Sequence, residues 1–126
     1  MVAVLDASAV LAVALSEIGA PKVAPFLADA WMSAVNHAEV LHGLKRQGIP
    51  FLIGEGLVDS LEITVVPFTR RLAGFAAELD AVTSVAGLSL GDRACLATGE
   101  AMSCPVVTAD RVWTSLGLDI EVISIR

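Results

Sequence analysis

Short apolar runs alternate with longer amphipathic stretches along the whole chain. The runs are rich in β-branched and small apolar residues, which is typical of strands buried on both faces of a parallel sheet. The strands predicted in this way are Val2–Leu5, Trp31–Val35, Glu62–Pro67, Pro105–Thr108 and Ile120–Ile125.

The stretches between these runs predict helices. Thr69 to about Val85 has the clearest helical periodicity, because its apolar residues recur three and four positions apart and so share one face. Asn36 and Ser89 are expected N-caps, and Gly48 is expected to end a helix. The predicted helices are Ala7–Glu17, Pro21–Ala28, Asn36–Gln47, Pro50–Ser60, Thr69–Val85, Ser89–Met102 and Arg111–Leu116.

Strands that alternate with helices are typical of an α/β fold. We therefore expect three α/β/α layers around a parallel sheet of about five strands, formed by residues 1–126 as a single domain. No basic leader segment precedes the first strand, and the longest apolar run is too short to cross a bilayer. Cys95 and Cys104 have apolar neighbours and are expected to be buried thiols. These features favour a cytoplasmic protein with no membrane contact.

Charge narrows the possible functions. The net charge is −6, and only 17% of residues are charged while 56% are hydrophobic. Nucleic-acid-binding proteins usually carry a basic surface, so this balance argues against one. The exception is a site in which divalent cations neutralise clustered acids and then face phosphate. The positions of the acidic residues therefore decide between a solubilising surface and a metal site.

Four acidic residues occupy positions that an α/β topology brings to one edge of the sheet. Asp6 ends the first predicted strand and Asp110 follows the fourth, while Glu39 and Asp92 lie in the first turns of helices. Ligands of open parallel sheets bind at the carboxyl ends of strands. Converging carboxylates repel one another, and Mg²⁺ or Mn²⁺ relieves that repulsion through oxygen ligands. The sequence thus suggests a metal site at this edge.

Each acid also has a purely structural explanation. Asn36–Glu39 and Ser89–Asp92 both have the spacing of a capping box, and acids are favoured in the first turn of any helix. The aspartates that follow strands would cap the next helix. His37 and His42 lie on different helix faces, and we interpret them as surface or capping residues, so no zinc site is expected.

Four segments in the same order resemble the motifs of PIN domains. The first is a strand that ends at Asp6 and is followed two residues later by Ser8. The second and third begin helices, with Glu39 and Asp92 in their first turns. The fourth is a strand that ends just before Asp110. The segments are Val4–Ala9, Ser33–Val40, Leu88–Ala97 and Val107–Trp113. They span nearly the whole chain, whose length resembles that of bacterial VapC toxins.

The resemblance implies a magnesium- or manganese-dependent endoribonuclease with strand order 3-2-1-4-5. It implies Asp6 and Asp92 as metal ligands, with Asp110 joining them directly or through water and Glu39 completing the catalytic group. It further implies that the protein cleaves structured RNA of the tRNA or rRNA class and so inhibits translation. The resemblance also implies that it forms a homodimer and is inhibited by a VapB-type antitoxin.

The resemblance also gives Ser8 and Thr108 the role of hydroxyls that hold carboxylates or water. Many relatives have another acid near the fourth motif, where this chain has Arg111, so a second metal ion is left open. Arg93 and Arg111 directly follow two of the acids, and each is a candidate contact for RNA phosphate or an ordinary solvated side chain.

Other functions remain as alternatives. A catalytically silent PIN binding module is disfavoured by the intact set of four acids, and a PIN nuclease that is not a toxin would share the chemistry. A phosphoacceptor receiver domain has a similar size and architecture, but it needs paired acids after the first strand and an aspartate after the third. This chain has Val66–Phe68 at the end of the third strand.

Overall fold

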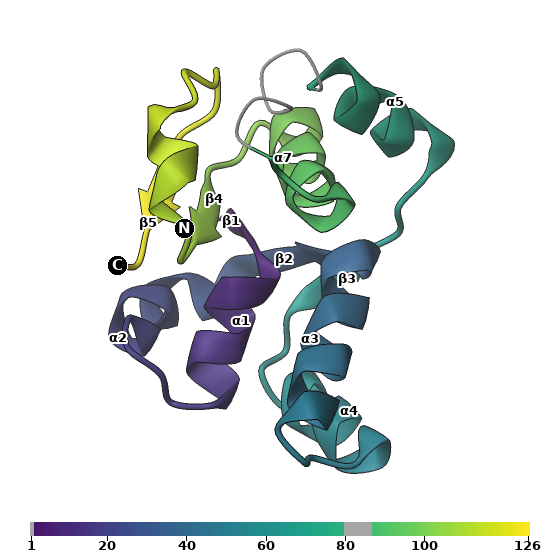
Figure 1. Ribbon diagram of the computed structural model, residues 1–126, viewed down its shortest axis with the longest axis vertical. Coiled ribbons are helices and arrows are strands. Elements are labelled where there is room, and N and C mark those ends of the chain that lie inside the picture. Colours follow the sequence, from purple (N-terminus) through teal and green to yellow (C-terminus); the bar gives the residue numbers. More distant parts are fainter. Residues whose placement is uncertain (1, 80–86) are drawn as a thin grey trace.

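A parallel five-stranded sheet forms the centre of the molecule (Figure 1). The structure is a computed structural model that describes residues 2–79 and 87–126. The strand order is β3-β2-β1-β4-β5, and every neighbouring pair is parallel. This confirms the α/β class and the strand order that the family resemblance implied. The strands are β1 (Ala3–Leu5), β2 (Ala30–Ser33), β3 (Thr64–Val66), β4 (Val106–Thr108) and β5 (Val122–Ser124).

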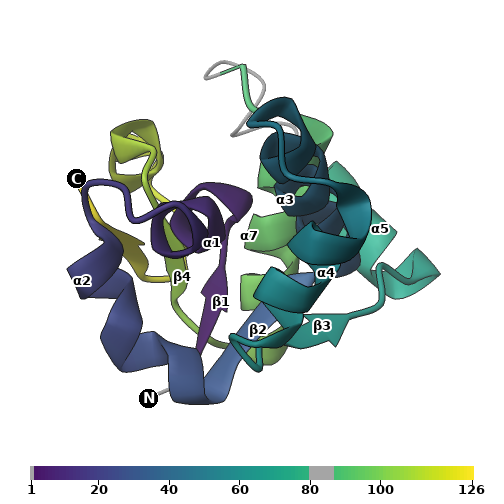
Figure 2. The same cartoon turned by 90° about the horizontal axis from the view of Figure 1, so that it is seen from below.

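Helices cover both faces of this sheet, which gives three layers (Figures 1 and 2). Helices α1, α2, α3 and α4 pack on one side, and α5 and α7 pack against each other on the opposite side. The α-helices are α1 (Ala7–Ala14), α2 (Ala20–Val23), α3 (Ala34–Arg46), α4 (Phe51–Asp59), α5 (Arg70–Glu78) and α7 (Leu90–Met102). Two 3-10 helices are η1 (Ala24–Asp29) and η3 (Arg111–Ser115).

The two layers of helices enclose two hydrophobic clusters because side chains alternate across a strand. Along β1, Ala3 and Leu5 pack into the cluster under α1 and α3, whereas Val4 packs into the cluster under α7. All three are fully buried. Trp113 is also buried and belongs to the second cluster. The central strand is therefore buried on both faces, and its carboxyl end lies between the two layers.

Several element boundaries differ from the predicted ones. Strand β2 ends at Ser33, whose hydroxyl caps α3 by accepting from the Val35 backbone N–H at 3.2 Å, so Asn36 lies inside the helix and is not its N-cap. The predicted helix from Pro21 is interrupted by Pro25, which lacks an N–H, and it continues as η1. Helix α5 ends at Glu78, and the remainder of the predicted helix lies largely outside the described residues.

The two cysteines do not pair with each other. Both cysteines are free thiols; Cys95 is buried and Cys104 is half-buried. The expectation of free thiols is therefore confirmed, although Cys104 is less enclosed than expected.

Within the described part of the chain, no helix combines the length and apolar character that crossing a membrane requires.

Candidate functional site

Asp6 lies where β1 ends and α1 begins, at the centre of the sheet edge. Its residue is only 5% exposed. Although it holds the N-cap position of α1, its side chain makes no capping hydrogen bond. Instead, its Oδ2 atom accepts hydrogen bonds from Ser8 Oγ at 2.7 Å and from Thr108 Oγ1 at 3.0 Å. The carboxylate is thus held mainly by two hydroxyls, and the Ala7 backbone N–H at the start of α1 adds a smaller interaction that also favours the charged form.

These two hydroxyls join chain segments that are far apart in the sequence. Ser8 Oγ accepts from the Ala109 backbone N–H at 2.9 Å, and Thr108 Oγ1 accepts from the Asp110 backbone N–H at 3.1 Å. A hydroxyl has one proton to donate and two lone pairs to accept with. Each hydroxyl therefore gives its proton to Asp6 and fixes the backbone that leaves β4, which positions Asp110 beside the end of β1.

Burial dominates the electrostatics of Asp6. Desolvation raises the pKa of its carboxyl from 3.8 to about 6; the Ser8 and Thr108 hydroxyls oppose this rise, and the negative charge of Asp92 adds to it. A desolvated carboxylate beside a second carboxylate is unfavourable unless a proton or a cation joins it. The site therefore favours the binding of positive charge at Asp6.

Glu39 is held over the start of α7 by a buried asparagine. The Asn36 amide Nδ2 donates to Glu39 Oε1 at 2.8 Å and to the Gly91 carbonyl oxygen at 2.9 Å, and so links α3 to α7. A side chain at Gly91 would overlap the Glu39 carboxylate, which would then have to turn away from the Asn36 amide. Asn36 and Gly91 were not recognised in the sequence as parts of this arrangement, because their contact spans 55 residues.

Asp92 lies half-buried in the first turn of α7 and forms the expected capping box with Ser89. Its Oδ2 accepts from the Ser89 backbone N–H at 3.0 Å, while its own N–H donates to Ser89 Oγ at 3.2 Å. One turn later, burial raises the pKa of the Cys95 thiol well above its ordinary value, and the charges of Asp6, Asp92 and Glu39 raise it further. Three carboxylates thus lie around one buried residue.

Asp110 differs from the other three acids. It is exposed, and its Oδ1 accepts from the Val112 backbone N–H at 2.9 Å, which caps η3. Its connection to Asp6 passes through its backbone and the Thr108 hydroxyl. The structure therefore places Asp92 near enough to Asp6 to raise the pKa of its carboxyl, brings Asp6, Asp92 and Glu39 around Cys95, and leaves Asp110 at the rim of the same edge.

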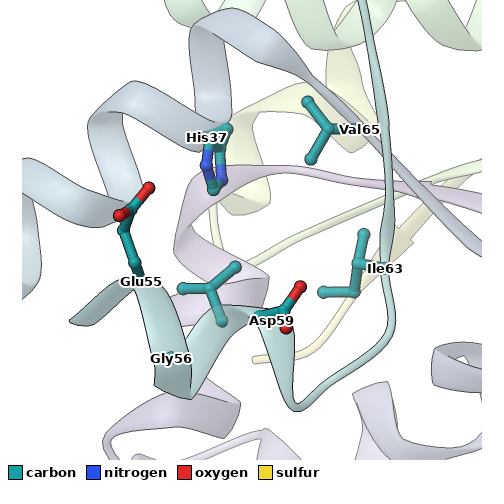
Figure 3. Close-up of a pocket in the computed structure, with 7 residues that line it drawn as sticks. His37, Glu55, Gly56, Asp59, Ile63 and Val65 are labelled. Carbon is teal, nitrogen blue, oxygen red and sulfur yellow. The ribbon is translucent and has the colours of Figure 1, made fainter. Parts of the chain in front are cut away.

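The two candidate arginines directly follow Asp92 and Asp110 in the chain. Arg93 is half-buried in the first turn of α7, and Arg111 is exposed at the start of η3. His37 is half-buried in the first turn of α3, and its Nδ1 atom is buried with no hydrogen-bond partner among residues 2–79 and 87–126. It lines a pocket of about 360 Å³. Figure 3 shows its ring near Glu55 and Asp59 of α4, which line the same pocket.

The donor chemistry of the edge fits a hard divalent cation. Carboxylate oxygens are the ligands that Mg²⁺ and Mn²⁺ prefer. Glu39, Asp92 and Asp110 each use one oxygen in the hydrogen bonds above, while both hydroxyls on Asp6 meet at Oδ2. Within the described ranges, no three acidic, histidine or cysteine side chains are close enough to enclose a metal ion. The edge supplies suitable ligands without forming a closed cage.

Comparison with known proteins identifies the fold. No curated protein matches the sequence. The structure is similar to that of VapBC2 from Rickettsia felis bound to a promoter DNA fragment (TM-score 0.75, 12% identity, 97% of each chain). It is also similar to FitAcB from Neisseria gonorrhoeae (TM-score 0.69, 21% identity, 99% of this chain and 98% of that one).

A third similar structure is VapBC-1 from nontypeable Haemophilus influenzae, with a TM-score of 0.74, 13% identity, and coverage of 99% of this chain and 98% of that one. At these identities the likeness concerns the fold. The sequence itself matches the profile of the PIN domain over residues 3–117, which include all four motifs and every acid of the edge. The chain therefore belongs to the PIN domain family.

Proposed function

We propose that this chain is a metal-dependent endoribonuclease that acts as the toxin of a toxin–antitoxin pair. The observation that carries the proposal is the environment of Asp6. Its carboxylate is buried, makes no capping hydrogen bond to α1, and has its pKa raised further by the negative charge of Asp92. Burying such a group costs stability unless a proton or cation neutralises it. A catalytic metal site gives a reason for that cost.

Asp6, Asp92 and Asp110 would hold Mg²⁺ or Mn²⁺ at the carboxyl edge. Bound there, the cation would supply a nucleophilic water and stabilise the charge that develops on the phosphodiester. Ser8 and Thr108 keep the Asp6 carboxylate in one orientation by donating to its Oδ2. Asn36 orients Glu39, whose other oxygen is left to hold the attacking water in line.

The toxin role is supported by the proteins whose structures are similar to this one. The similar structures from Rickettsia felis and Haemophilus influenzae are VapBC complexes, and another is described as a toxin–antitoxin complex from Klebsiella pneumoniae. By analogy, this chain would form a homodimer and bind a VapB-type antitoxin that blocks the edge. It would halt translation by cleaving tRNA or rRNA. The chain has no tyrosine and 5% aromatic residues, which favours recognition of RNA shape over base stacking.

Cleavage of total cellular RNA tests the nuclease proposal. Purified wild-type chain with Mg²⁺ or Mn²⁺ should give discrete fragments, and EDTA or the Asp92→Asn variant should abolish them. Asp119→Asn is the matched control, because this aspartate is exposed and lies outside the four motifs. Cleavage that persists in Asp92→Asn, or that fails equally in Asp119→Asn, would contradict the assigned site.

Growth measurements test the toxin role separately. Induced expression of the wild-type chain in a bacterial host should stop growth, while Asp92→Asn should not. Co-expression with a protein encoded by a neighbouring reading frame should restore growth if that protein is the antitoxin. Normal growth despite active RNA cleavage in vitro would favour a PIN nuclease that is not a toxin.

A further inference from the structure

A second pocket lies beside the acidic edge, at the carboxyl end of β5. Its volume is about 540 Å³, within the usual range for ligand sites. Part of its lining is apolar and consists of Pro21, the buried Ile125 and Ile18, which is 81% exposed. Three cations line the same pocket, Lys22, Arg111 and Arg126. We call this site the basic pocket.

The three cations are notable in so acidic a chain. The whole sequence has eight lysines and arginines against fourteen acids, and three of the eight line this one pocket. All three are exposed. None of the acids in the described ranges forms an ion pair with Lys22, Arg111 or Arg126. Their charge is therefore available to an anionic ligand.

Backbone contacts fix the basic pocket relative to the acidic edge. The Ile125 N–H donates to the Thr108 carbonyl oxygen at 3.0 Å, and the Thr108 hydroxyl donates to Asp6. Gly19 packs the loop before α2 against this strand end; its φ is +96° and a Cβ there would lie 2.6 Å from the Ile125 carbonyl oxygen. Since β1, β4 and β5 are neighbours, the pocket lies two strand spacings from Asp6, about 10 Å.

We propose that the basic pocket binds the backbone of the RNA strand beyond the bond to be cut, with Lys22, Arg111 and Arg126 on phosphates and Ile18 and Pro21 against a ribose or base. This inference rests on the proposed ribonuclease function. Arg111 belongs to both regions, because it follows Asp110 directly and lines the pocket. A nucleotide chain matches the pocket in having anionic groups next to apolar faces.

The proposal explains how an acidic protein holds a polyanion. The acids of the edge repel RNA wherever no cation covers them, so attraction must come from elsewhere on the same surface. Lysines and arginines that contact phosphate release counterions, which makes binding weaken steeply with salt. Three phosphate contacts correspond to a change of about 2 in the slope of log affinity against log salt for single strands. That slope distinguishes local contacts from a general charge effect.

The test measures RNA binding separately from cleavage. A fluorescein-labelled single-stranded RNA of mixed sequence is titrated with the Asp92→Asn chain in Mg²⁺ at several salt concentrations, followed by anisotropy. The pocket variant adds Lys22→Gln, Arg111→Gln and Arg126→Gln. The matched control adds Lys45→Gln, Arg46→Gln and Arg70→Gln, exposed cations on α3 and α5 whose loss changes the net charge equally.

We expect the pocket variant to lose at least about tenfold in affinity at low salt and about 2 in slope, and the control to lose less than about threefold. Equal losses in both variants, or an unchanged slope in the pocket variant, would overturn the proposal. The same variants are also titrated with a labelled polyglutamate peptide. If the pocket variant binds RNA normally but no longer binds this peptide, the RNA proposal is wrong and the pocket binds an acidic protein partner.

Two further measurements keep the outcome interpretable. Thermal melting shows whether each variant is folded, and the single variants Lys22→Gln and Arg126→Gln replace the triple variant if it melts early. Cleavage by the otherwise unmodified chain tests the ribonuclease function itself. If the unmodified chain cleaves RNA but the pocket variant binds RNA as well as the control does, only the inference about the basic pocket is contradicted. If the unmodified chain does not cleave RNA but the pocket variant binds RNA more weakly than the control, only the nuclease proposal is contradicted.

Discussion

Asp6 and Asp110 end neighbouring strands at the same edge of the sheet, yet their environments are opposite. Asp6 is buried, caps no helix and accepts from two hydroxyls, and its pKa is raised to about 6. Asp110 is exposed and caps η3 through the Val112 N–H. The capping bond alone is a sufficient structural reason for Asp110. Asp6 has no such reason, so its burial is the stronger indication of function.

Asp92 lies between these two extremes. It completes a capping box with Ser89, as a structural residue would, but it also raises the pKa of Asp6. Position in the sequence therefore does not separate a structural acid from a catalytic one. The separation comes from what each carboxylate contacts, and variants at these positions can test it.

The largest effect is expected for Asp6→Asn on RNA cleavage. The amide keeps the shape and can still accept from Ser8 and Thr108, but it loses the charge that attracts a cation. We expect a loss of at least about 100-fold in cleavage rate, equivalent to about 3 kcal/mol of transition-state stabilisation. Initial rates in Mg²⁺ measure it, and a rate close to wild type would remove Asp6 from the site.

The same variant should change the pH dependence of stability in metal-free protein. Because the folded pKa of Asp6 is about 6 and the ordinary value is 3.8, the native state holds a proton that the unfolded chain has already released. The free energy of unfolding should fall as pH rises from about 4 to about 6, by up to about 3 kcal/mol. Urea unfolding in EDTA measures this, and Asp6→Asn should flatten that part of the profile.

Gly91→Ala should disturb the acidic edge from the opposite side. The new methyl group would overlap the Glu39 carboxylate and force it away from the Asn36 amide, so we expect reduced cleavage and a destabilisation of about 1 kcal/mol from the lost hydrogen bond. Gly74→Ala is the matched control, since no atom lies within 4 Å of a Cβ there and alanine favours a helix by about 0.5–1 kcal/mol. Similar melting shifts in both variants would contradict the close packing of Glu39 on Gly91.

The smallest effect is expected for the stability of Asp110→Asn. Asparagine caps helices about as well as aspartate, so unfolding free energy should change by less than about 0.5 kcal/mol. Cleavage should still fall, by about tenfold, if the carboxylate contributes to metal binding directly or through water. A drop in stability without a drop in cleavage would mean that Asp110 only caps η3.

The sequence predicted the elements more reliably than their contacts. Alternating apolar runs located all five strands, and the resemblance to PIN domains gave their order. The N-cap of α3 was misplaced, because both Ser33 and Asn36 suit that position and the choice depends on where β2 ends. The role of Asn36 depends on Gly91, 55 residues away, and no local pattern reveals such a contact. The partly buried position of His37 likewise follows from its packing beside α4.

The central position of β1 has a consequence for protein synthesis. The strand that carries Asp6 is made first, but its neighbour β4 and the Thr108 hydroxyl follow 102 residues later. At about 5–20 residues per second, a ribosome needs about 5–20 s to translate that interval. A nascent chain therefore lacks the assembled edge until Thr108 and Asp110 have been synthesised. An incomplete product therefore lacks the hydroxyl that holds Asp6 and could not carry out chemistry that depends on that edge.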